Sequence, residues 1–308
     1  MPFTLSLNTN PLVNRFADPD DLIDTVAYRI GVRDIQLTHE FLHPDWPAEL
    51  RTRMLGRLRQ ARQRAGVRVT SVMTGPYGRL NFFGHPDAGV RRYAVDWFRR
   101  LADGAAELDA AAMGTQFAIL AQRDHDDAAR RAVRIDEALA CWAEVADHAR
   151  AVGLAWLFWE PMSVGREFGH TLAHCAELQE RIDGAGLAVP LRMMVDIDHG
   201  DVTSANPADT DPYAWAEAFA SRSPIIHVKQ SSVNKGGHWP FTAAYNRDGR
   251  IVPQRLLDVI RRGGGTDNEI CLELSFRERE PADSQAVAMI RESVAFWAPY
   301  VETGAVAS

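Results

Sequence analysis

The sequence is poor in cysteine and has no cysteines spaced for a zinc knuckle or a disulfide framework. Its 308 residues contain three cysteines, Cys141, Cys175 and Cys271, which lie far apart inside apolar or helical patterns. Such thiols are typical of buried side chains in a reducing compartment, so we expect a cytoplasmic protein. There is no basic stretch before the first apolar residues and no run of about eighteen apolar residues, so we expect neither export nor a membrane partner.

Long basic runs are absent too. The chain carries 34 basic and 41 acidic residues, a formal net charge of -7, and this balance would repel duplex nucleic acid. We therefore expect no nucleic-acid partner. No glycine- or serine-rich linker, charge block or low-complexity stretch divides the sequence, which predicts a single domain over residues 1–308.

The sequence also lacks a phosphate-binding glycine loop after an early strand. The stretch Thr74-Gly75-Pro76-Tyr77-Gly78 does not have the glycine spacing that opens a dinucleotide-binding fold. An open six-stranded sheet, the alternative fold, would need such a loop. A closed barrel would not, and the pattern of apolar residues favours the barrel.

Eight short apolar runs alternate with longer amphipathic segments. The runs are residues 3–7, 34–37, 67–73, 112–119, 154–160, 191–196, 225–228 and 270–275. The amphipathic segments are residues 20–28, 50–65, 89–108, 128–152, 170–182, 212–220, 253–262 and 284–297. Near-continuous apolar strands that alternate with helices indicate a parallel sheet covered by helices. Eight such units in a chain of this length predict an α/β fold, a (β/α)8 TIM barrel.

Four of the later runs end in a single ionisable side chain, at Glu160, Asp196, His227 and Glu273. In a parallel barrel the carboxyl ends of the strands share one mouth, and adjacent strands lie about 4.8 Å apart. Four consecutive strands can therefore bring these groups to one ion. Three carboxylates and one imidazole favour a single divalent ion such as Mn²⁺, Mg²⁺ or Co²⁺ over a structural zinc. Taken alone, each residue could instead be a polar strand end that faces solvent.

Residues close to these strand ends are candidates for substrate binding. His199 follows Asp196 by three residues and is close enough to reach a substrate oxygen or a second metal ion. Lys229 lies two residues after His227 on the same side of the strand, and a lysine there suits an anionic group. Arg277 follows the last strand with the inward parity of Glu273, at a place where barrels often bind phosphate.

Three further candidates also have structural explanations. Glu167 could clamp a substrate hydroxyl, or it could be an acidic residue at the amino terminus of a helix. Lys235, with the glycines that follow it, could cradle a phosphate or be a solvated surface side chain. Asn8, at the end of the first strand, could touch a substrate hydroxyl or cap a turn.

The late strand ends resemble the site of the xylose-isomerase-like barrel superfamily, and within it the ketose 3-epimerases. Their pattern of Glu, Asp-x-x-His, His and Glu on successive strands is met by Glu160, Asp196 with His199, His227 and Glu273. Residues 159–281 also resemble a narrower group, the tetrulose-phosphate epimerases of erythritol catabolism. Where the free-sugar epimerases carry an arginine six residues after the metal-binding histidine, this chain has Val233, and it has Lys229 nearer the ion. This departure favours a phosphorylated substrate.

The resemblance implies a reaction and roles for the site residues. A metal-dependent epimerase would invert C3 of a 2-ketose phosphate through an enediolate, converting L-erythrulose 1-phosphate to D-erythrulose 1-phosphate. Glu160 and Glu273 would both bind the ion, with manganese expected first, and act as acid and base. His199 would hold a substrate oxygen, while Lys229 and Arg277 would hold the phosphate. Relatives of this kind commonly form homodimers or homotetramers.

Several alternative functions remain at this point. A free-ketose 3-epimerase or an aldose–ketose isomerase would use a related site on the same barrel. A non-catalytic sugar-phosphate sensor would keep Lys229 but would not need an acid and a base. A phosphodiesterase or endonuclease of the superfamily would need more histidines at the ends of the third and fourth strands, where this chain has Met73 and Phe117.

Overall fold

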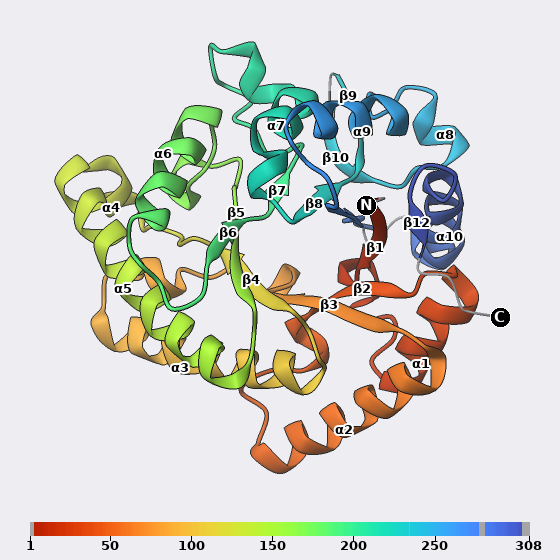
Figure 1. Cartoon of the computed structure of the whole chain (residues 1–308), viewed down its shortest axis with the longest axis horizontal. Helices are drawn as coiled ribbons and strands as arrows, with labels where there is room; N and C mark the ends of the chain where they lie inside the picture. The colour runs from red at the N-terminus through yellow and green to blue at the C-terminus, as the bar shows by residue number, and fades with distance from the viewer. Residues whose placement is uncertain (1–2, 234, 277–280, 304–308) are drawn as a thin grey trace.

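A closed ring of parallel strands forms the centre of the computed structural model, which describes residues 3–233, 235–276 and 281–303 (Figure 1). The strands of the ring are β1 (Thr4–Asn8), β2 (Asp34–Thr38), β3 (Arg68–Met73), β4 (Ala112–Gln116), β5 (Trp156–Glu160), β6 (Leu191–Met193), β7 (Val195–Asp196), β8 (Ile225–Val228) and β11 (Glu269–Leu272). Their order is β6-β5-β4-β3-β2-β1-β11-β8-β7, and β12 (Glu302–Thr303) pairs with β1 outside this path.

The two ends of this order are one interrupted strand. Only Met194 separates β6 from β7, and its amide donates a hydrogen bond to the Trp159 carbonyl of β5 at 2.9 Å. Every neighbouring pair around the ring is parallel, including β7 with β8. The sheet therefore closes with eight strand positions, and the predicted (β/α)8 barrel is confirmed.

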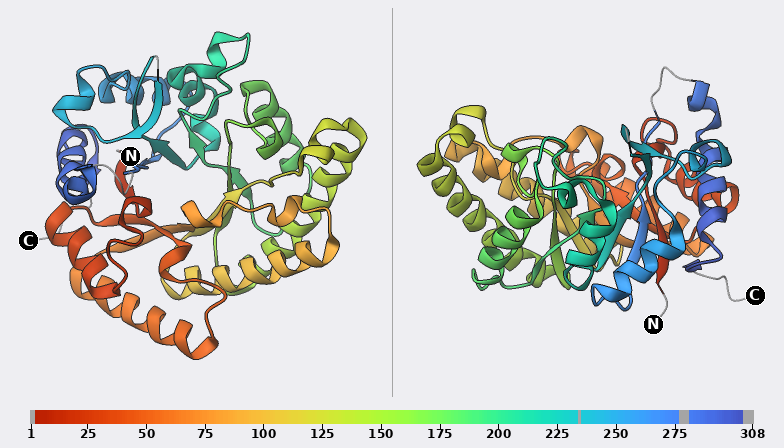
Figure 2. Two further views of the ribbon diagram at one scale, coloured as in Figure 1. Left: turned by 180° about the vertical axis from the view of Figure 1, so that it is seen from behind. Right: turned by 90° about the horizontal axis from the view of Figure 1, so that it is seen from above.

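Helices surround the barrel on its outer side, as both views of Figure 2 show. They are α1 (Pro19–Asp24), α2 (Ala48–Ala65), α3 (Ala88–Glu107), α4 (Gln122–Asp126), α5 (Ala128–Val152), α6 (Leu172–Asp183), α7 (Pro212–Phe219), α8 (Ala243–Asn246), α9 (Pro253–Arg262) and α10 (Ala286–Trp297). Among the residues that the structure describes, no helix is long and apolar enough to cross a membrane.

Local sequence determines where several of these helices begin and end. The side chain of Asp127 accepts hydrogen bonds from the backbone amides of Ala129 and Arg130 at the start of α5, which satisfies amides that have no partner within the helix. The same helix ends at Gly153, whose φ of 92° lies in the left-handed region that favours glycine. These signals explain why the predicted segment 128–152 matches α5.

The predicted boundaries are wrong in several places. The strands predicted over 112–119 and 270–275 end at Gln116 and Leu272. The helix predicted over 20–28 is α-helical only to Asp24 and continues as a π-helical turn, η2 (Thr25–Ile30), that ends at Gly31 with a φ of 90°. The polar, glycine-bearing segment after His227, which is not among the eight predicted strands, contains an antiparallel hairpin of β9 (Gln230–Ser232) and β10 (Lys235–Trp239).

Two apolar layers support the barrel. The large layer fills the space between strands and helices. A small layer fills the inside of the ring and consists of Met73, Ala112, Phe158, Met194, Ile225 and Cys271. Gly114 makes room for it, since a Cβ at this position would lie 2.1 Å from the carbonyl oxygen of Phe158. The inner layer leaves the carboxyl ends of the strands for polar side chains.

Candidate active site

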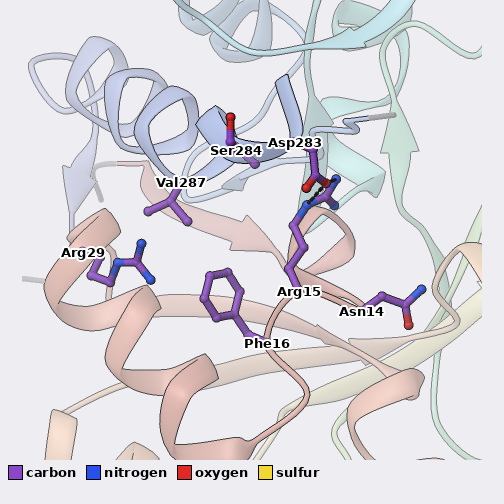
Figure 3. A pocket seen from close by; sticks show the side chains of 8 residues that line it. Asn14, Arg15, Phe16, Arg29, Asp283, Ser284 and Val287 are labelled. Carbon is purple, nitrogen blue, oxygen red and sulfur yellow. Dashed lines mark hydrogen bonds and ion pairs between the residues drawn. The ribbon is translucent and has the colours of Figure 1, made fainter. Parts of the chain in front are cut away.

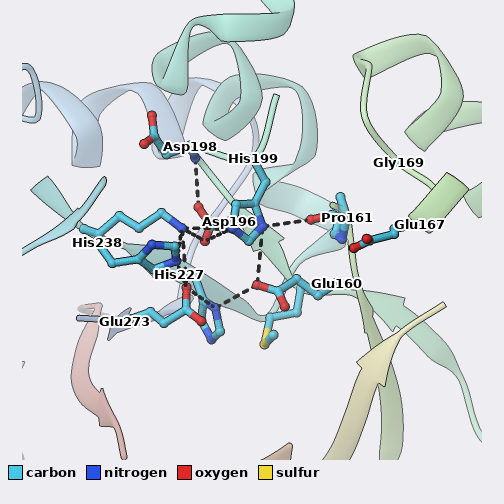
Figure 4. Close-up of polar contacts among 12 residues, drawn as sticks. Glu160, Pro161, Glu167, Gly169, Asp196, Asp198, His199, His227, His238 and Glu273 are labelled. Atoms are coloured by element: carbon cyan, nitrogen blue, oxygen red, sulfur yellow. Dashed lines mark hydrogen bonds and ion pairs between the residues drawn. The ribbon is translucent and has the colours of Figure 1, made fainter. Parts of the chain in front are cut away.

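Four buried side chains meet inside the carboxyl end of the barrel (Figure 4). Glu160 ends β5, Asp196 ends β7, His227 lies opposite Asp196 in the register of β8, and Glu273 directly follows β11. Nδ1 of His227 lies 3.1 Å from Oε1 of Glu160 and 3.5 Å from Oε2 of Glu273. One ligand atom from each of the four residues lies within 4.8 Å of the others. The structure thus brings together all four residues predicted as metal ligands.

A glutamine that the sequence analysis missed orients the imidazole of this cluster. Oε1 of Gln36, on β2, accepts a hydrogen bond from Nε2 of His227 at 2.7 Å. A side-chain oxygen of glutamine cannot donate, so Nε2 of His227 must carry the proton. The other ring nitrogen, Nδ1, therefore faces Glu160 and Glu273, where a metal ion could take its lone pair.

The same glutamine joins a buried network below the site. Nδ2 of Asn8 donates to Oε1 of Gln36 at 2.7 Å and to Sδ of Met73 at 3.0 Å. Nε2 of Gln36 donates to Oγ of Ser71 at 3.0 Å. Oδ1 of Asn8 accepts from the amide of Asn10 at 2.8 Å, which is the capping arrangement considered for this residue. The predicted contact of Asn8 with a substrate hydroxyl therefore stays a prediction.

Lys229 lies within the cluster rather than on the rim. Its side chain is 1% exposed, and Nζ forms an ion pair with Asp196. Nζ also lies 3.4 Å from Oε2 of Glu273. The charge of Lys229 is thus already paired with two carboxylates, whereas a lysine that binds an anionic substrate would be unpaired without that substrate.

Two histidines complete the surroundings of this ammonium group. Nε2 of His199 lies 3.1 Å from Nζ of Lys229, and Nε2 of His238 lies 2.8 Å from it. His199 was predicted to be near the site; His238, on β10, was not assigned a role. Nδ1 of His199 lies 3.1 Å from the carbonyl oxygen of Pro161, and because that oxygen only accepts, Nδ1 is the protonated nitrogen. Its Nε2 is left to accept from Lys229.

The electrostatics of the site follow from burying so many ionisable groups together. Burial raises the pKa of Asp196 to about 6 against the opposing effect of Lys229. Burial lowers the pKa of His199 to about 3, and Lys229 acts in the same direction. Burial would lower the pKa of His227, but Glu273 and Glu160 beside it raise that pKa well above its ordinary value. The cluster therefore attracts positive charge at Nδ1 of His227.

The remaining predicted residues lie elsewhere or outside the described residues. Glu167 is buried, but its Oε2 accepts hydrogen bonds from Nε and Nη2 of Arg79 at 3.0 and 2.6 Å, and Figure 4 shows it to one side of the cluster. It joins the loops after β3 and β5 and is the last residue of the short 3-10 turn η6 (Gly165–Glu167), so it is not at the amino terminus of a long helix. Arg277 and the side chain of Lys235 lie outside the described residues.

Asn10 is a further residue that sequence reasoning missed. Its Nδ2 donates to Oε1 of Glu273 at 3.3 Å from the turn after β1. This contact leaves Oε2 of Glu273 to face His227, Lys229 and His238. The two oxygens of this carboxylate therefore have different surroundings, one neutral and one strongly positive.

A separate hollow lies between the first helical segments and α10 (Figure 3). Arg15 and Asp283 are joined across it by a hydrogen bond of 2.9 Å from Nε to Oδ1, and Phe16 and Val287 line its apolar part. The guanidinium of Arg29, which also lines the hollow, lies 5.5 Å from the centre of the Phe16 ring. Among the described lining residues Asp283 is the one carboxylate, so the hollow does not show the converging carboxylates of the barrel mouth.

Comparison with known proteins identifies the family of this barrel. The family described as xylose isomerase-like TIM barrel matches residues 25–299. The chain is 61% identical over 305 residues to the D-erythrulose 1-phosphate 3-epimerase of Brucella abortus (strain 2308), a match that covers 99% of this chain and 98% of that protein.

Solved structures share the fold over almost the whole chain. A candidate xylose isomerase from Rhodospirillum rubrum has a TM-score of 0.85 at 25% identity and covers 97% of this chain and 100% of its own. D-psicose 3-epimerase from Clostridium cellulolyticum H10 has a TM-score of 0.71 at 14% identity, with 98% and 100% covered. At that identity the second likeness is one of fold.

Proposed function

The chain belongs to the xylose isomerase-like TIM barrel family and is an isomerase, and we propose that it epimerises C3 of a 2-ketose phosphate. The proposed reaction converts L-erythrulose 1-phosphate to D-erythrulose 1-phosphate, in keeping with the name of the 61% identical relative. The observation that carries the proposal is the placement of Glu160 and Glu273, two buried carboxylates from strands β5 and β11 that both contact Nδ1 of His227. An epimerase needs two such groups, one for each face of the carbon that it inverts.

A single divalent ion fits the residues present. Glu160, Asp196 and Glu273 offer carboxylate oxygens, and Gln36 turns the lone pair of His227 Nδ1 toward them. This donor set is typical of Mn²⁺, Mg²⁺ or Co²⁺, and we propose Mn²⁺. When bound, such an ion supplies Lewis-acid stabilisation of negative charge on the substrate oxygens beside C3.

The proton transfers fall to the two glutamates. One carboxylate takes the proton from C3, and the carboxylic acid on the opposite face returns a proton to the same carbon. Both side chains are nearly excluded from water, at 2% exposure for Glu160 and 6% for Glu273, so the proton that is delivered comes from the enzyme. We keep His199 as a candidate for contact with a substrate oxygen; in the structure its Nδ1 is held by the Pro161 carbonyl and its Nε2 accepts from Lys229.

The phosphate requires cations beyond the cluster. Arg277 is our candidate, together with Lys235 and its neighbouring glycines. Lys229 was predicted to share this role, but its contacts with Asp196 and Glu273 favour a different one, which we develop in the next subsection. We further propose that the enzyme acts in erythritol catabolism in the cytoplasm as a homodimer or homotetramer.

Proton exchange tests the proposal directly. Incubation of L-erythrulose 1-phosphate in D₂O with the Mn²⁺-loaded enzyme should place deuterium at C3 of both epimers, as read by NMR. Deuterium at C1 instead of C3 would place proton removal on the other side of the ketone and overturn the assignment of C3. Equal turnover of unphosphorylated ketoses would identify a free-sugar epimerase, and conversion of a free ketose to an aldose would identify an aldose–ketose isomerase. Absence of label from both epimers would refute the proposed chemistry.

A variant separates catalysis from ligand sensing. Glu273→Gln should lower turnover by about 10²–10⁴-fold, since it removes one of the two proton-transfer groups while keeping the shape of the side chain. Arg79→Lys, in the loop contact with Glu167 away from the cluster, is the control for general damage to the barrel mouth. Unchanged turnover in Glu273→Gln would favour a sensor that does not need this carboxylate.

A further inference from the structure

A second group of potential metal ligands lies beside the first. It consists of Asp196, His199, His238 and Glu273, and one ligand atom from each lies within 4.8 Å of the others. It shares Asp196 and Glu273 with the proposed metal group and adds two histidines to them. Groups that share carboxylates in this way are typical of sites that hold two cations side by side.

The ammonium group of Lys229 contacts all four members of this second group. Nζ forms an ion pair with Oδ2 of Asp196, and lies 3.1 Å from Nε2 of His199 and 2.8 Å from Nε2 of His238. It lies 3.4 Å from Oε2 of Glu273. An ammonium group has three N–H donors, and three of these neighbours are close acceptors. The donors of Lys229 are therefore satisfied within the protein.

The choice of lysine over arginine at this position is itself informative. The chain has 34 basic residues, of which only Lys229 and Lys235 are lysines. Arginine thus supplies nearly all the positive charge of this protein, yet a lysine with 1% exposure lies at the centre of the described site. Ammonium is a compact point charge that four converging ligands can surround, whereas guanidinium is a planar fork.

We propose that the Lys229 ammonium fills a second cation position next to the metal site, so that this barrel takes one divalent ion instead of two. The proposal rests on the proposed function for the identity of the first ion. Formal charges agree with it in the state in which both glutamates are ionised: Glu160, Asp196 and Glu273 then carry three negative charges, and one divalent ion with one ammonium balances them. A buried site is stable when its charges cancel in this way.

Counting metal ions in a lysine variant tests this inference. Metal-stripped wild type and Lys229→Met are each titrated with Mn²⁺ by calorimetry, and bound manganese is then measured per chain after gel filtration. We expect the variant to bind one more ion than wild type. Two Mn²⁺ ions that share Asp196 and Glu273 should also give an exchange-coupled EPR spectrum, which a single ion cannot give.

Two further variants control the count. The double variant Lys229→Met with His238→Ala removes a ligand that belongs only to the second group, so the additional ion should be lost while the first is kept. Lys235→Met removes the same charge at the only other lysine and should leave the count as in wild type. Lys229→Ala, which is smaller, replaces Lys229→Met if the latter does not show a native circular dichroism spectrum.

Each outcome decides for or against the inference. An equal metal count in wild type and in Lys229→Met overturns it. A Lys229→Met protein whose KM rises only for the phosphorylated ketose, and not for the free ketose, also overturns it, because that result would assign Lys229 to the phosphate. Loss of all metal from the variant also overturns it. If wild type binds no ion and the variant binds one, the lysine inference holds and the proposed metal dependence fails.

Discussion

Replacing Gln36 with leucine should weaken both the fold and the affinity for metal. The substitution keeps a side chain of similar size but removes every hydrogen bond of the amide. Oε1 of Gln36 accepts from Asn8 and His227, both at 2.7 Å, and Nε2 donates to Ser71 at 3.0 Å. All four residues are fully buried at 0% exposure, so water cannot take the place of the lost partner.

The expected loss follows from the groups left without a partner. Nε2–H of His227 loses its acceptor, and the hydroxyl of Ser71 loses its donor. Nδ2 of Asn8 loses one acceptor but keeps the sulfur of Met73. A buried polar group that is left unsatisfied costs about 1–3 kcal/mol. Because the two groups belong to one network, their costs do not simply add, and we expect a decrease of about 2–5 kcal/mol in the free energy of unfolding. Without Gln36 the ring of His227 is also free to change tautomer, and metal affinity should fall by about 10–100-fold.

Urea unfolding followed by tryptophan fluorescence gives the first quantity, and calorimetric titration of metal-stripped protein with Mn²⁺ gives the second. Gln179→Leu is a matched control, because Gln179 is a buried glutamine of α6 that bonds Nε1 of Trp159 at 2.8 Å and the Leu191 carbonyl at 3.0 Å outside the barrel. This control should lose stability but keep its metal affinity. If the two variants bind Mn²⁺ equally well, Gln36 does not orient His227.

Two other substitutions test the barrel itself. Gly114→Ala adds a Cβ that would lie 2.1 Å from the carbonyl oxygen of Phe158. The free energy of unfolding, measured in urea, should therefore fall by about 1–3 kcal/mol. A variant as stable as the wild type would show that the inner layer can accommodate the added methyl group. Glu269→Gln concerns pH: burial raises the pKa of Glu269 from 4.5, against a hydrogen bond from Thr70 that lowers it. The stability that protonated Glu269 provides to the wild type is complete below about pH 4.5 and is lost as the pH rises through the folded-state pKa. Because glutamine does not ionise, Glu269→Gln should be more stable than the wild type at alkaline pH and should lose this advantage in acid. A constant difference in unfolding free energy across the pH range would contradict this reasoning.

The sequence was sufficient to predict the barrel because its strands are buried on both faces. Such strands are continuous apolar runs, and their alternation with helical segments identifies the fold without further information. The run 112–119 shows the limit of this signal. Phe117 is as fully buried as the strand before it, but its ring packs against Trp159 and Phe168 after the strand has ended at Gln116. Apolar residues report burial, and burial does not stop where strand pairing stops.

The metal ligands could be predicted from the same apolar runs. An ionisable residue at the end of an apolar run stands out, as Glu160 and Glu273 do. Gln36 does not stand out, because a neutral amide within the short strand Asp34–Thr38 resembles any residue that faces solvent. Its importance arises from a 2.7 Å contact with His227, far away in the sequence, and one sequence does not contain that pairing. His238 was missed because its hairpin, rich in glycine and polar residues, resembles a loop.

One side of the barrel supplies the charged groups of the site, and the other side supplies neutral groups that hold them in place. Strands β5, β7 and β8 and the residue after β11 supply every carboxylate and the imidazole of the proposed metal group. Strands β1, β2 and β3 supply the neutral groups of Asn8, Gln36 and Ser71 beneath them. Neutral hydrogen-bonding groups fix the position of His227 without adding charge, so the charge balance of the site is set by its carboxylates, by Lys229 and by the ion. A carboxylate in place of Gln36 would still orient His227, but it would add a fourth negative charge to a group that one ion and one ammonium already balance.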